Sequence, residues 1–232
     1  MFKWFALTAF ALIFTGCAAY KQHRAGPAVA EESPWPMALR IPGATYRIDE
    51  SRSELRILVY RAGPLARLGH NHVVVNRSLK GAVKVAGGKS GFWLAVPAKG
   101  FVVDPLPARR EEGADFAADV PEDAKSGTLD HMLSAAVLDA GEFPEITVSG
   151  MAGAPGAHPM MVTVTVRVAG HESTIETPFT LDIDTGSLSA TGSLELRQSA
   201  LGLTPYSLML GALQVQDALT VKFKIIADSA GT

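Results

Sequence analysis

Hydrophobic and polar residues alternate with a period of two along the C-terminal half of the chain, which is the pattern of half-buried β-strands. The clearest case is 162–168, where valine at every second position alternates with threonine and arginine. The pattern returns over 174–183, 188–197 and 219–225, and short turn-like segments separate the first three runs. Each run therefore has one apolar face, and the short connections predict antiparallel hairpins.

The earlier part of the folded region shows shorter runs of the same kind and one segment with helical spacing. We expect strands near residues 44–49, 53–61, 72–76, 79–86, 91–96 and 99–104. Residues 128–138 favour a helix instead, because apolar side chains recur there at helical spacing and Thr128 can cap its start. An antiparallel sheet of about eight strands has to hide one apolar face and avoid open edges. The sequence therefore predicts a mostly β fold, an antiparallel up-and-down barrel with one short capping helix.

The apolar faces of these strands are expected to line the inside of the barrel. The interior candidates are Leu55, Ile57, Val59, Val164, Val166, Phe179, Leu181, Leu194, Leu196, Val221 and Phe223. None of the four C-terminal apolar faces carries a charge, so a molecule held inside would have to be apolar, and its burial would contribute about 0.8 kcal/mol per methylene group. A second interpretation stays open, in which side chains fill the barrel and the domain serves as a membrane-tethered interaction module.

The first residues have the pattern of a secretory signal. Lys3 precedes the apolar run 4–14, which is too short to span a bilayer, and Gly16 stands before Cys17, the only cysteine of the chain. We therefore expect residues 1–16 to be a signal peptide that is removed and Cys17 to be acylated. The alternative is an ordinary cleavage just beyond an unmodified cysteine.

The segment that follows has the composition of a linker. Residues 17–42 contain four prolines and no apolar periodicity, which is typical of an extended tether. The folded domain is expected to cover 43–228, and 229–232 would be a short tail. Acylation would attach the exported protein to a membrane, and Ala18 directly after the cysteine favours the outer membrane of a bacterium with two membranes. The predicted location is therefore the periplasm, on a lipid anchor.

Charge and cysteine content narrow the function classes. The formal net charge of the chain is −2, which argues against a nucleic-acid-binding surface and against a polybasic membrane patch. With Cys17 acylated, no cysteine is left for a disulfide, so the domain must be held by its core. Neither property indicates an oligomeric state.

One segment interrupts the strand pattern and carries the candidate chemistry. Residues 61–72 contain Arg61, Arg67, His70 and His72 between two apolar runs. If the end of this segment is extended, both imidazoles project to the same face and could share a metal ion or a haem. Two imidazoles are not a complete site. The candidates for a third ligand are Asp104, Asp130 and His131.

Two other interpretations of this segment stay open. In one, Gly69 makes a tight turn, and the neighbouring histidine and asparagine side chains hydrogen-bond backbone groups and fix the loop. In the other, Arg61, Arg67, His70 and His72 lie at the barrel mouth and meet the polar head of a lipid or quinone whose tail lies inside. The last interpretation assigns the segment to ligand binding without a metal.

We find no catalytic motif in the sequence. The charged run 109–113 has no periodicity and is expected to be a solvated loop. The chain contains no nucleophile elbow and no phosphate-binding loop, and the adjacent Asp130 and His131 would not face each other on a helix. The sequence therefore favours a binding protein over an enzyme, with no cofactor required.

Several short motifs occur in an order that resembles a known family. They are Tyr46-Arg47-Ile48-Asp49, Met132-Leu133-Ser134, Phe143-Pro144-Glu145-Ile146, Val168-Ala169-Gly170, Thr177-Pro178-Phe179, Leu201-Gly202-Leu203-Thr204-Pro205 and Gly211-Ala212-Leu213. Through these motifs, over most of residues 45–227, the sequence resembles the YceI-like proteins, lipocalin-like barrels that bind polyisoprenoid lipids. The resemblance implies a lipocalin-like barrel capped by the helix near 128–138, with an isoprenoid chain inside and no catalytic residues. The segment Gly69-His70-Asn71-His72 departs from the looser glycine and phenylalanine pattern of the family.

From the residues and the resemblance together, we expect an exported, lipid-anchored barrel. Its ligand would be a polyisoprenoid or an isoprenoid quinone, which it would carry, buffer or scavenge. The alternative is a metal- or haem-binding protein centred on His70 and His72.

Overall fold

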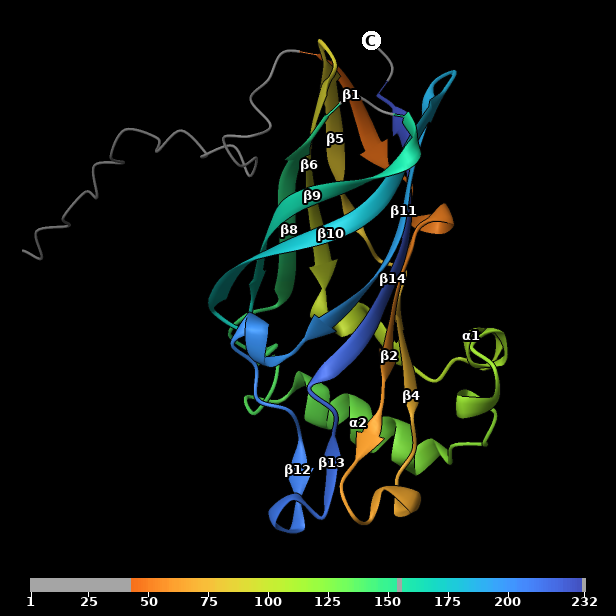
Figure 1. Ribbon diagram of the computed structural model, residues 1–232, viewed down its shortest axis with the longest axis vertical. Coiled ribbons are helices and arrows are strands. Elements are labelled where there is room, and N and C mark those ends of the chain that lie inside the picture. The colour runs from red at the N-terminus through yellow and green to blue at the C-terminus, as the bar shows by residue number, and fades with distance from the viewer. Residues whose placement is uncertain (1–42, 154–155, 231–232) are drawn as a thin grey trace, which may run out of the picture. The chain divides into compact units, whose positions relative to one another are not determined.

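The structure is a computed structural model, and it describes residues 43–153 and 156–230 (Figure 1). The predicted signal peptide, Cys17 and the predicted tether lie outside the described residues, so these expectations stay predictions. Within the described part of the chain, no helix is both long enough and apolar enough to cross a membrane.

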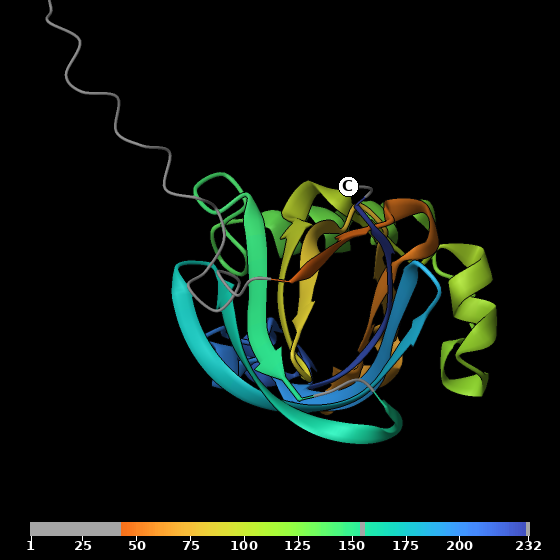
Figure 2. The ribbon, with the colours of Figure 1, turned by 90° about the horizontal axis from the view of Figure 1, so that it is seen from above.

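Eight strands form a closed antiparallel barrel. In the order in which they neighbour one another, they are β1 (Ala44–Ile48), β5 (Lys80–Ala86), β6 (Lys89–Pro97), β8 (Glu145–Ala152), β9 (Gly156–Val168), β10 (His171–Asp184), β11 (Ser187–Arg197) and β14 (Ala218–Ser229). Each strand pairs with the next, and β14 returns to pair with β1, which closes the ring (Figure 2). The prediction of a mostly β, antiparallel barrel is confirmed.

Three further strands continue the wall at one end of the barrel. β14 pairs with β1 near its C-terminal end but with β2 (Glu54–Val59) over its first half, and β2 leads on to β4 (His72–Asn76) and β7 (Phe101–Val103). The buried Ser53 bridges this change of partner, because its hydroxyl donates to the carbonyl of Ile226 and accepts from the amide of the same residue. The wall therefore stays hydrogen-bonded where one partner strand replaces the other.

Helices and a small sheet complete the domain. α1 (Leu106–Glu111) packs outside the ring of strands, and α2 (Glu122–Leu133) lies across one end of the barrel (Figures 1 and 2). A separate three-stranded sheet at that end consists of β3 (Arg61–Ala62), β12 (Ser207–Leu208) and β13 (Leu213–Val215). Short 3-10 helices lie between the strands at η2 (Glu50–Arg52), η3 (Ala66–Leu68), η4 (Ala98–Gly100), η5 (Ala114–Phe116), η6 (Ser199–Leu201) and η7 (Met209–Gly211).

The position of the capping helix differs from the expected 128–138. α2 begins earlier, at Glu122, directly after Pro121, and it ends at Leu133. Proline is favoured at the start of a helix, and the acidic residues of the first turn interact favourably with the helix dipole. Thr128 therefore lies in the middle of the helix, where its hydroxyl donates to the carbonyl of Ala124 instead of capping the start.

The prediction that 109–113 is a solvated loop is also wrong, because the first residues of this run belong to α1. Arg109 is buried there, and Ala108 packs with Phe116 against the outer face of β4. β4 is thus buried on both faces, between the barrel interior and α1, which explains its unbroken apolar run. β9 keeps the predicted alternation, with buried valines on one face only. The packing of Ala108 and Phe116 on the outer face holds β4 in place, together with the β4 side chains that point into the barrel.

Candidate ligand-binding site

The barrel encloses an apolar cavity of about 640 Å³. Side chains from all eight barrel strands line it, and α2 closes one end with Thr128, His131 and Met132. The volume lies within the roughly 300–1,000 Å³ that is typical of ligand sites. The barrel is therefore not filled by its own side chains, which contradicts the solid-barrel interpretation. All eleven interior candidates named from the sequence, from Leu55 to Phe223, line this cavity.

Most of the polar side chains of the lining gather at the end that α2 covers, and these are Arg61, His70, His72, Thr128, His131, Gln198, Tyr206 and Gln214. The other polar side chains of the lining are Ser90, Trp93 and Thr177. Among the described lining residues, Arg61 is the only one with a formal charge. The cavity thus has a long apolar part and one polar end, which is the arrangement expected of a site for an amphiphile.

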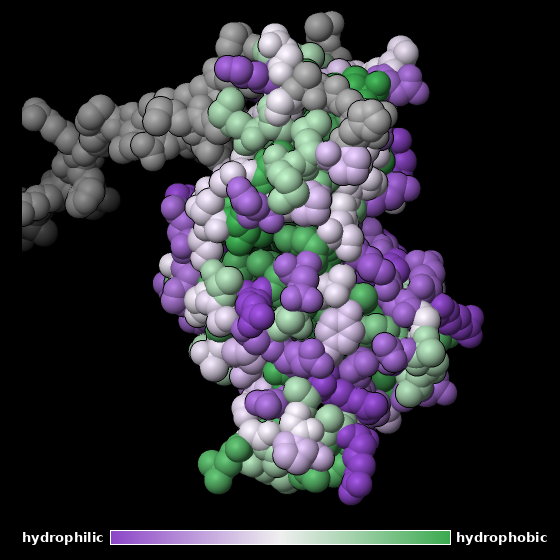
Figure 3. Space-filling view, in the orientation of Figure 1, coloured by the Kyte–Doolittle hydropathy of each residue, from purple (hydrophilic) through white to green (hydrophobic). Residues whose placement is uncertain are grey.

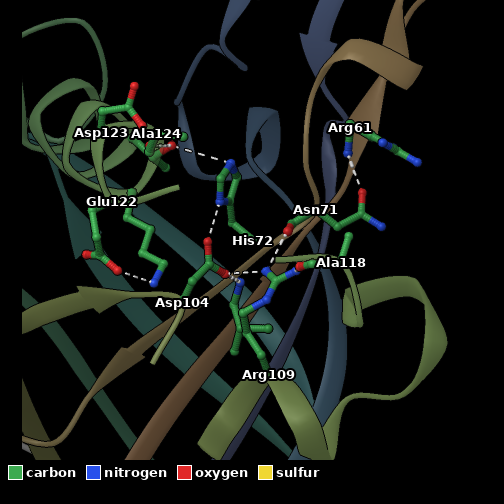
Figure 4. Close-up of polar contacts among 12 residues, drawn as sticks. Arg61, Asn71, His72, Asp104, Arg109, Ala118, Glu122, Asp123 and Ala124 are labelled. Carbon is green, nitrogen blue, oxygen red and sulfur yellow. Dashed lines mark hydrogen bonds and ion pairs between the residues drawn. The ribbon is translucent and has the colours of Figure 1, made fainter. Parts of the chain in front are cut away.

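A buried carboxylate at this end holds His72 in one orientation (Figure 4). Asp104 follows β7 with a φ of 53°, a conformation that aspartate tolerates better than most residues. It accepts hydrogen bonds from Nδ1 of His72 at 2.7 Å and from the backbone amide of Val73 at 2.8 Å. It also accepts one from Nη1 of Arg109 at 2.5 Å. Strand β4, strand β7 and helix α1 therefore meet at a single carboxylate.

The charge of this carboxylate sets the proton position on His72. Burial raises the pKa of Asp104, but hydrogen bonds from His72, from a backbone amide and from Arg109 outweigh burial and hold that pKa below its ordinary value of 3.8. The ionised carboxylate only accepts, so Nδ1 of His72 carries the proton between them. Nε2 lies 3.4 Å from Oγ1 of Thr128, whose hydroxyl already donates to the Ala124 carbonyl at 2.8 Å. In the neutral imidazole, Nε2 therefore offers an acceptor to a ligand in the cavity.

The other polar residues proposed from the sequence divide between the cavity and the surface. Arg61 and His70 line the cavity together with His72, and the two imidazole centroids are 6.1 Å apart. Nη1 of Arg61 donates to the carbonyl of Gly69 at 2.6 Å, which orders the loop. Arg67 does not line the cavity, because it sits on η3, outside the barrel wall, and is exposed.

Asn71 ties this loop to its surroundings (Figure 4). Its side-chain oxygen accepts from the backbone amide of Arg61 at 3.0 Å, and its side-chain nitrogen donates to the carbonyl of Asp115 at 3.1 Å. Loop fixation and cavity lining, which the sequence left as separate interpretations, therefore occur together in the segment 61–72.

A metal or haem site at the two histidines gains no support. The described residues contain no group of three or more His, Cys, Asp or Glu side chains that could hold a metal ion. Asp104 is already shared between His72 and Arg109, and Asp130 is exposed. The ring of His131 packs against Tyr206, with centroids 4.0 Å apart. None of the three proposed third ligands thus completes a site.

The cavity also opens through the side of the barrel, between β10 and β11. These strands pair from Asp184 to Thr180 and no further. A Cβ placed on Gly192 would lie 2.6 Å from the carbonyl oxygen of Pro178, so the backbone of Pro178 faces β11. The backbone nitrogen of proline carries no hydrogen, so Pro178 cannot donate a hydrogen bond to β11. Beyond this point the strands diverge, and the hydrophobic interior is visible in a hollow of the same face (Figures 1 and 3).

Sequence reasoning missed the residues that irregular segments bring to the polar end. Gln198, Tyr206 and Gln214 lie outside the long alternating runs or in the small sheet, so no periodicity marked them. For Arg109 a signal was present, since Pro105 immediately precedes the residues that form α1, and proline is common at a helix start.

Comparisons with known proteins match both the sequence and the fold. A family model described as YceI-like domain matches residues 46–227. Among solved structures, the chain is similar to BcnA from Burkholderia cenocepacia, with 15% identity, 78% of this chain and 99% of that chain covered, and a TM-score of 0.55. It is also similar to a polyisoprenoid binding domain from Saccharophagus degradans, with 11% identity, 80% and 99% coverage, and a TM-score of 0.54. At these identities the structural likeness shows the fold alone. A search of curated proteins finds no match.

Proposed function

Because the chain belongs to the YceI-like domain family, we propose that it is an exported, lipid-anchored protein that holds a polyisoprenoid or an isoprenoid quinone in its barrel. It carries, buffers or scavenges this lipid and performs no chemistry on it. The apolar cavity of about 640 Å³ is the observation that carries the proposal. The neighbour from Saccharophagus degradans is described as a polyisoprenoid binding domain, which supports the choice of lipid class.

The walls of the cavity suit a branched hydrocarbon chain. They are built from valine, leucine, isoleucine and phenylalanine side chains of all eight strands, and most of the lining lies away from the polar end. Each methylene or methyl group that leaves water for this environment contributes about 0.8 kcal/mol to binding. Affinity would therefore come mainly from the length of chain that is buried along these apolar walls.

The polar end gives the bound lipid a direction. Nε2 of His72 presents an acceptor to the cavity, and Thr128, His131 and Tyr206 line the same end. A terminal hydroxyl of a prenol or of a quinol can donate to Nε2, while its isoprenoid tail extends along the apolar walls toward the opening between β10 and β11.

The direct test is the lipid content of the protein itself. We expect an organic extract of the purified protein to contain an isoprenoid lipid in near-stoichiometric amount, identified by mass spectrometry. Delipidated protein should take up an offered prenol or quinone. Repeated preparations that contain no bound lipid and take up none of the offered isoprenoids would overturn the proposal.

Replacing His72 with phenylalanine should reduce the affinity for a prenol by about tenfold, because one hydrogen bond to the head group is lost. The affinity for the hydrocarbon analogue that lacks the hydroxyl should fall much less, since phenylalanine keeps an aromatic ring of similar size in the wall even though it no longer donates to Asp104. Both affinities are measured by fluorescence competition with delipidated protein, and His171→Phe, at an exposed histidine outside the lining, is the control. Equal loss for both ligands would contradict a head-group contact.

A further inference from the structure

Exposed apolar side chains project from the end of the barrel that α2 covers, and we call this group the docking tip. It consists of Leu68 on η3 and of Leu208, Met209 and Leu210 at the turn between β12 and β13. Leu68 is 65% exposed, Met209 is 75% exposed and Leu210 is fully exposed. The two parts are neighbours, because β13 pairs with β3 and contacts η3. Figures 1 and 3 show the turn as a hydrophobic projection at the lower end of the domain.

The backbone holds these side chains outward. Met209 and Leu210 have φ values of 50° and 55°, which are unfavourable for residues with bulky side chains. Hydrogen bonds secure the turn, since the Ala212 amide donates to the Met209 carbonyl at 3.2 Å and the Leu65 amide donates to the Ala212 carbonyl at 2.8 Å. A strained turn that exposes large apolar side chains is typical of a functional contact rather than of a simple connection.

The two segments that build the tip carry few charges, and these charges are of one sign. The two segments that build it, 61–69 and 206–215, contain no acidic residue, and their charged residues are Arg61 and Arg67. Both arginines are exposed, and Arg67 lies on η3 directly before Leu68. Arginine beside exposed leucine and methionine is the combination that enters the boundary between lipid tails and anionic head groups.

We propose that the docking tip inserts into the surface of an anionic lipid bilayer, with Arg67 and Arg61 against the lipid phosphates. A protein partner fits the observations less well, because a stable protein interface buries about 800 Å² on each side through roughly 20–30 residues. The docking tip offers four apolar side chains on a narrow turn and a neighbouring 3-10 helix. A bilayer needs no matching surface and accepts such a projection.

Docking in this way would bring the polar end of the cavity to the head groups. Leu213, next to the tip in β13, lines the cavity, and Arg61 belongs both to the lining and to the tip surroundings. The end that bears the tip would thus be the end where a lipid enters or leaves. The membrane contact itself does not depend on the proposed cargo, so the two can be tested separately.

The proposed N-terminal anchor is compatible with this orientation. β1 pairs with the C-terminal end of β14, whereas the docking tip precedes the N-terminal end of β14, so the predicted tether joins the opposite end of the barrel. The twelve residues of β14 span about 40 Å. Residues 18–42 can reach about 80 Å if fully extended, which is enough for the tip to meet the membrane that holds the anchor.

Vesicle flotation tests the docking tip on the chain from residue 17, made with Cys17→Ser so that no acyl anchor contributes. We expect this protein to float with vesicles of phosphatidylethanolamine and phosphatidylglycerol. The double change Met209→Asp and Leu210→Asp should lower the bound fraction by about tenfold or more. Arg67→Glu should weaken binding to these vesicles and leave the weaker binding to phosphatidylcholine vesicles unchanged.

The matched control is Met161→Asp, which changes another exposed apolar residue, on β9 and 62% exposed. It should float like the parent, and all variants should keep the bound isoprenoid content of the parent, so failure of docking is distinguishable from failure of cargo binding. No flotation of the parent, or equal loss in Met161→Asp, would overturn the proposal. So would a dimer in light scattering that only the tip variant dissociates, because the tip would then join two copies of the chain.

Discussion

Replacing Val164 with tryptophan is expected to lower the lipid bound per purified molecule by about tenfold or more. Val164 is buried on β9, and its side chain lines the cavity. The indole takes the space that a ligand chain would occupy, and because residue 164 lines the cavity, the larger side chain extends into the cavity and gains packing contacts with the facing walls. The measurement is mass spectrometry of the extracted lipid, normalised to protein, together with a thermal unfolding curve that should stay cooperative.

The control for this prediction is Thr163→Trp, the adjacent residue on the same strand. Thr163 is exposed on the outer face, so its replacement should leave both the lipid content and the fold unchanged. If Val164→Trp does not fold, Ala190→Phe on β11, which lines the same cavity, provides a second version of the experiment. Full lipid content in a folded variant with a filled cavity would contradict the placement of the ligand inside the barrel.

Replacing Arg109 with alanine should lower the free energy of unfolding by about 3–5 kcal/mol. The Arg109 side chain is 7% exposed, and its partner Asp104 is completely buried, so the change leaves an ionised carboxylate in the interior without its arginine partner. The change also removes the donors that satisfy the backbone carbonyls of Asn71 and Ala118. Urea denaturation of delipidated protein measures the effect. Arg110→Ala, the exposed neighbour on α1, should change the free energy of unfolding by less than about 0.5 kcal/mol.

The same pair predicts a shift in acid stability. In the folded protein the pKa of Asp104 lies below the ordinary 3.8, so near that pH the unfolded chain binds more protons and stability falls as the pH is lowered. Without Arg109 the pKa of Asp104 rises toward its value in the unfolded chain, so this carboxylate loses less stability on acidification, and the difference in free energy of unfolding between the parent and Arg109→Ala should shrink as the pH falls below about 4. A difference that stays constant over this pH range would show that Asp104 is not held ionised by this arginine.

The barrel and its apolar wall could be predicted because their signal is local. The alternation that places Val164 inside and Thr163 outside is present in every long strand of the C-terminal half, and a strand of known register fixes the face of each residue. The same parity places His70 and His72 on the cavity side of the wall. These parts of the site follow from the period of two without knowledge of the strand order.

The polar end could not be predicted in this way, because distant segments build it. Asp104 accepts from the amide of Val73, thirty-one positions away, and from an arginine in a run that looked solvated. Tyr206 reaches the cavity end from an irregular segment and contacts His131 on α2. Helix α2 itself carries little amphipathic pattern, so its start was marked only by Pro121 and the acidic first turn. Contacts of this kind depend on the closed barrel and leave no periodic trace in the sequence.

The gap between β10 and β11 bears on which lipids the protein would tell apart. A closed cavity has to accommodate the full length of its ligand, so a chain with an additional isoprene unit would clash with the far wall. Here the wall is interrupted beyond Pro178, so surplus chain would pass outward while the head group stays beside His72. A protein built in this way would discriminate among head groups and be indifferent to chain length, so one copy could serve short precursors and long products alike.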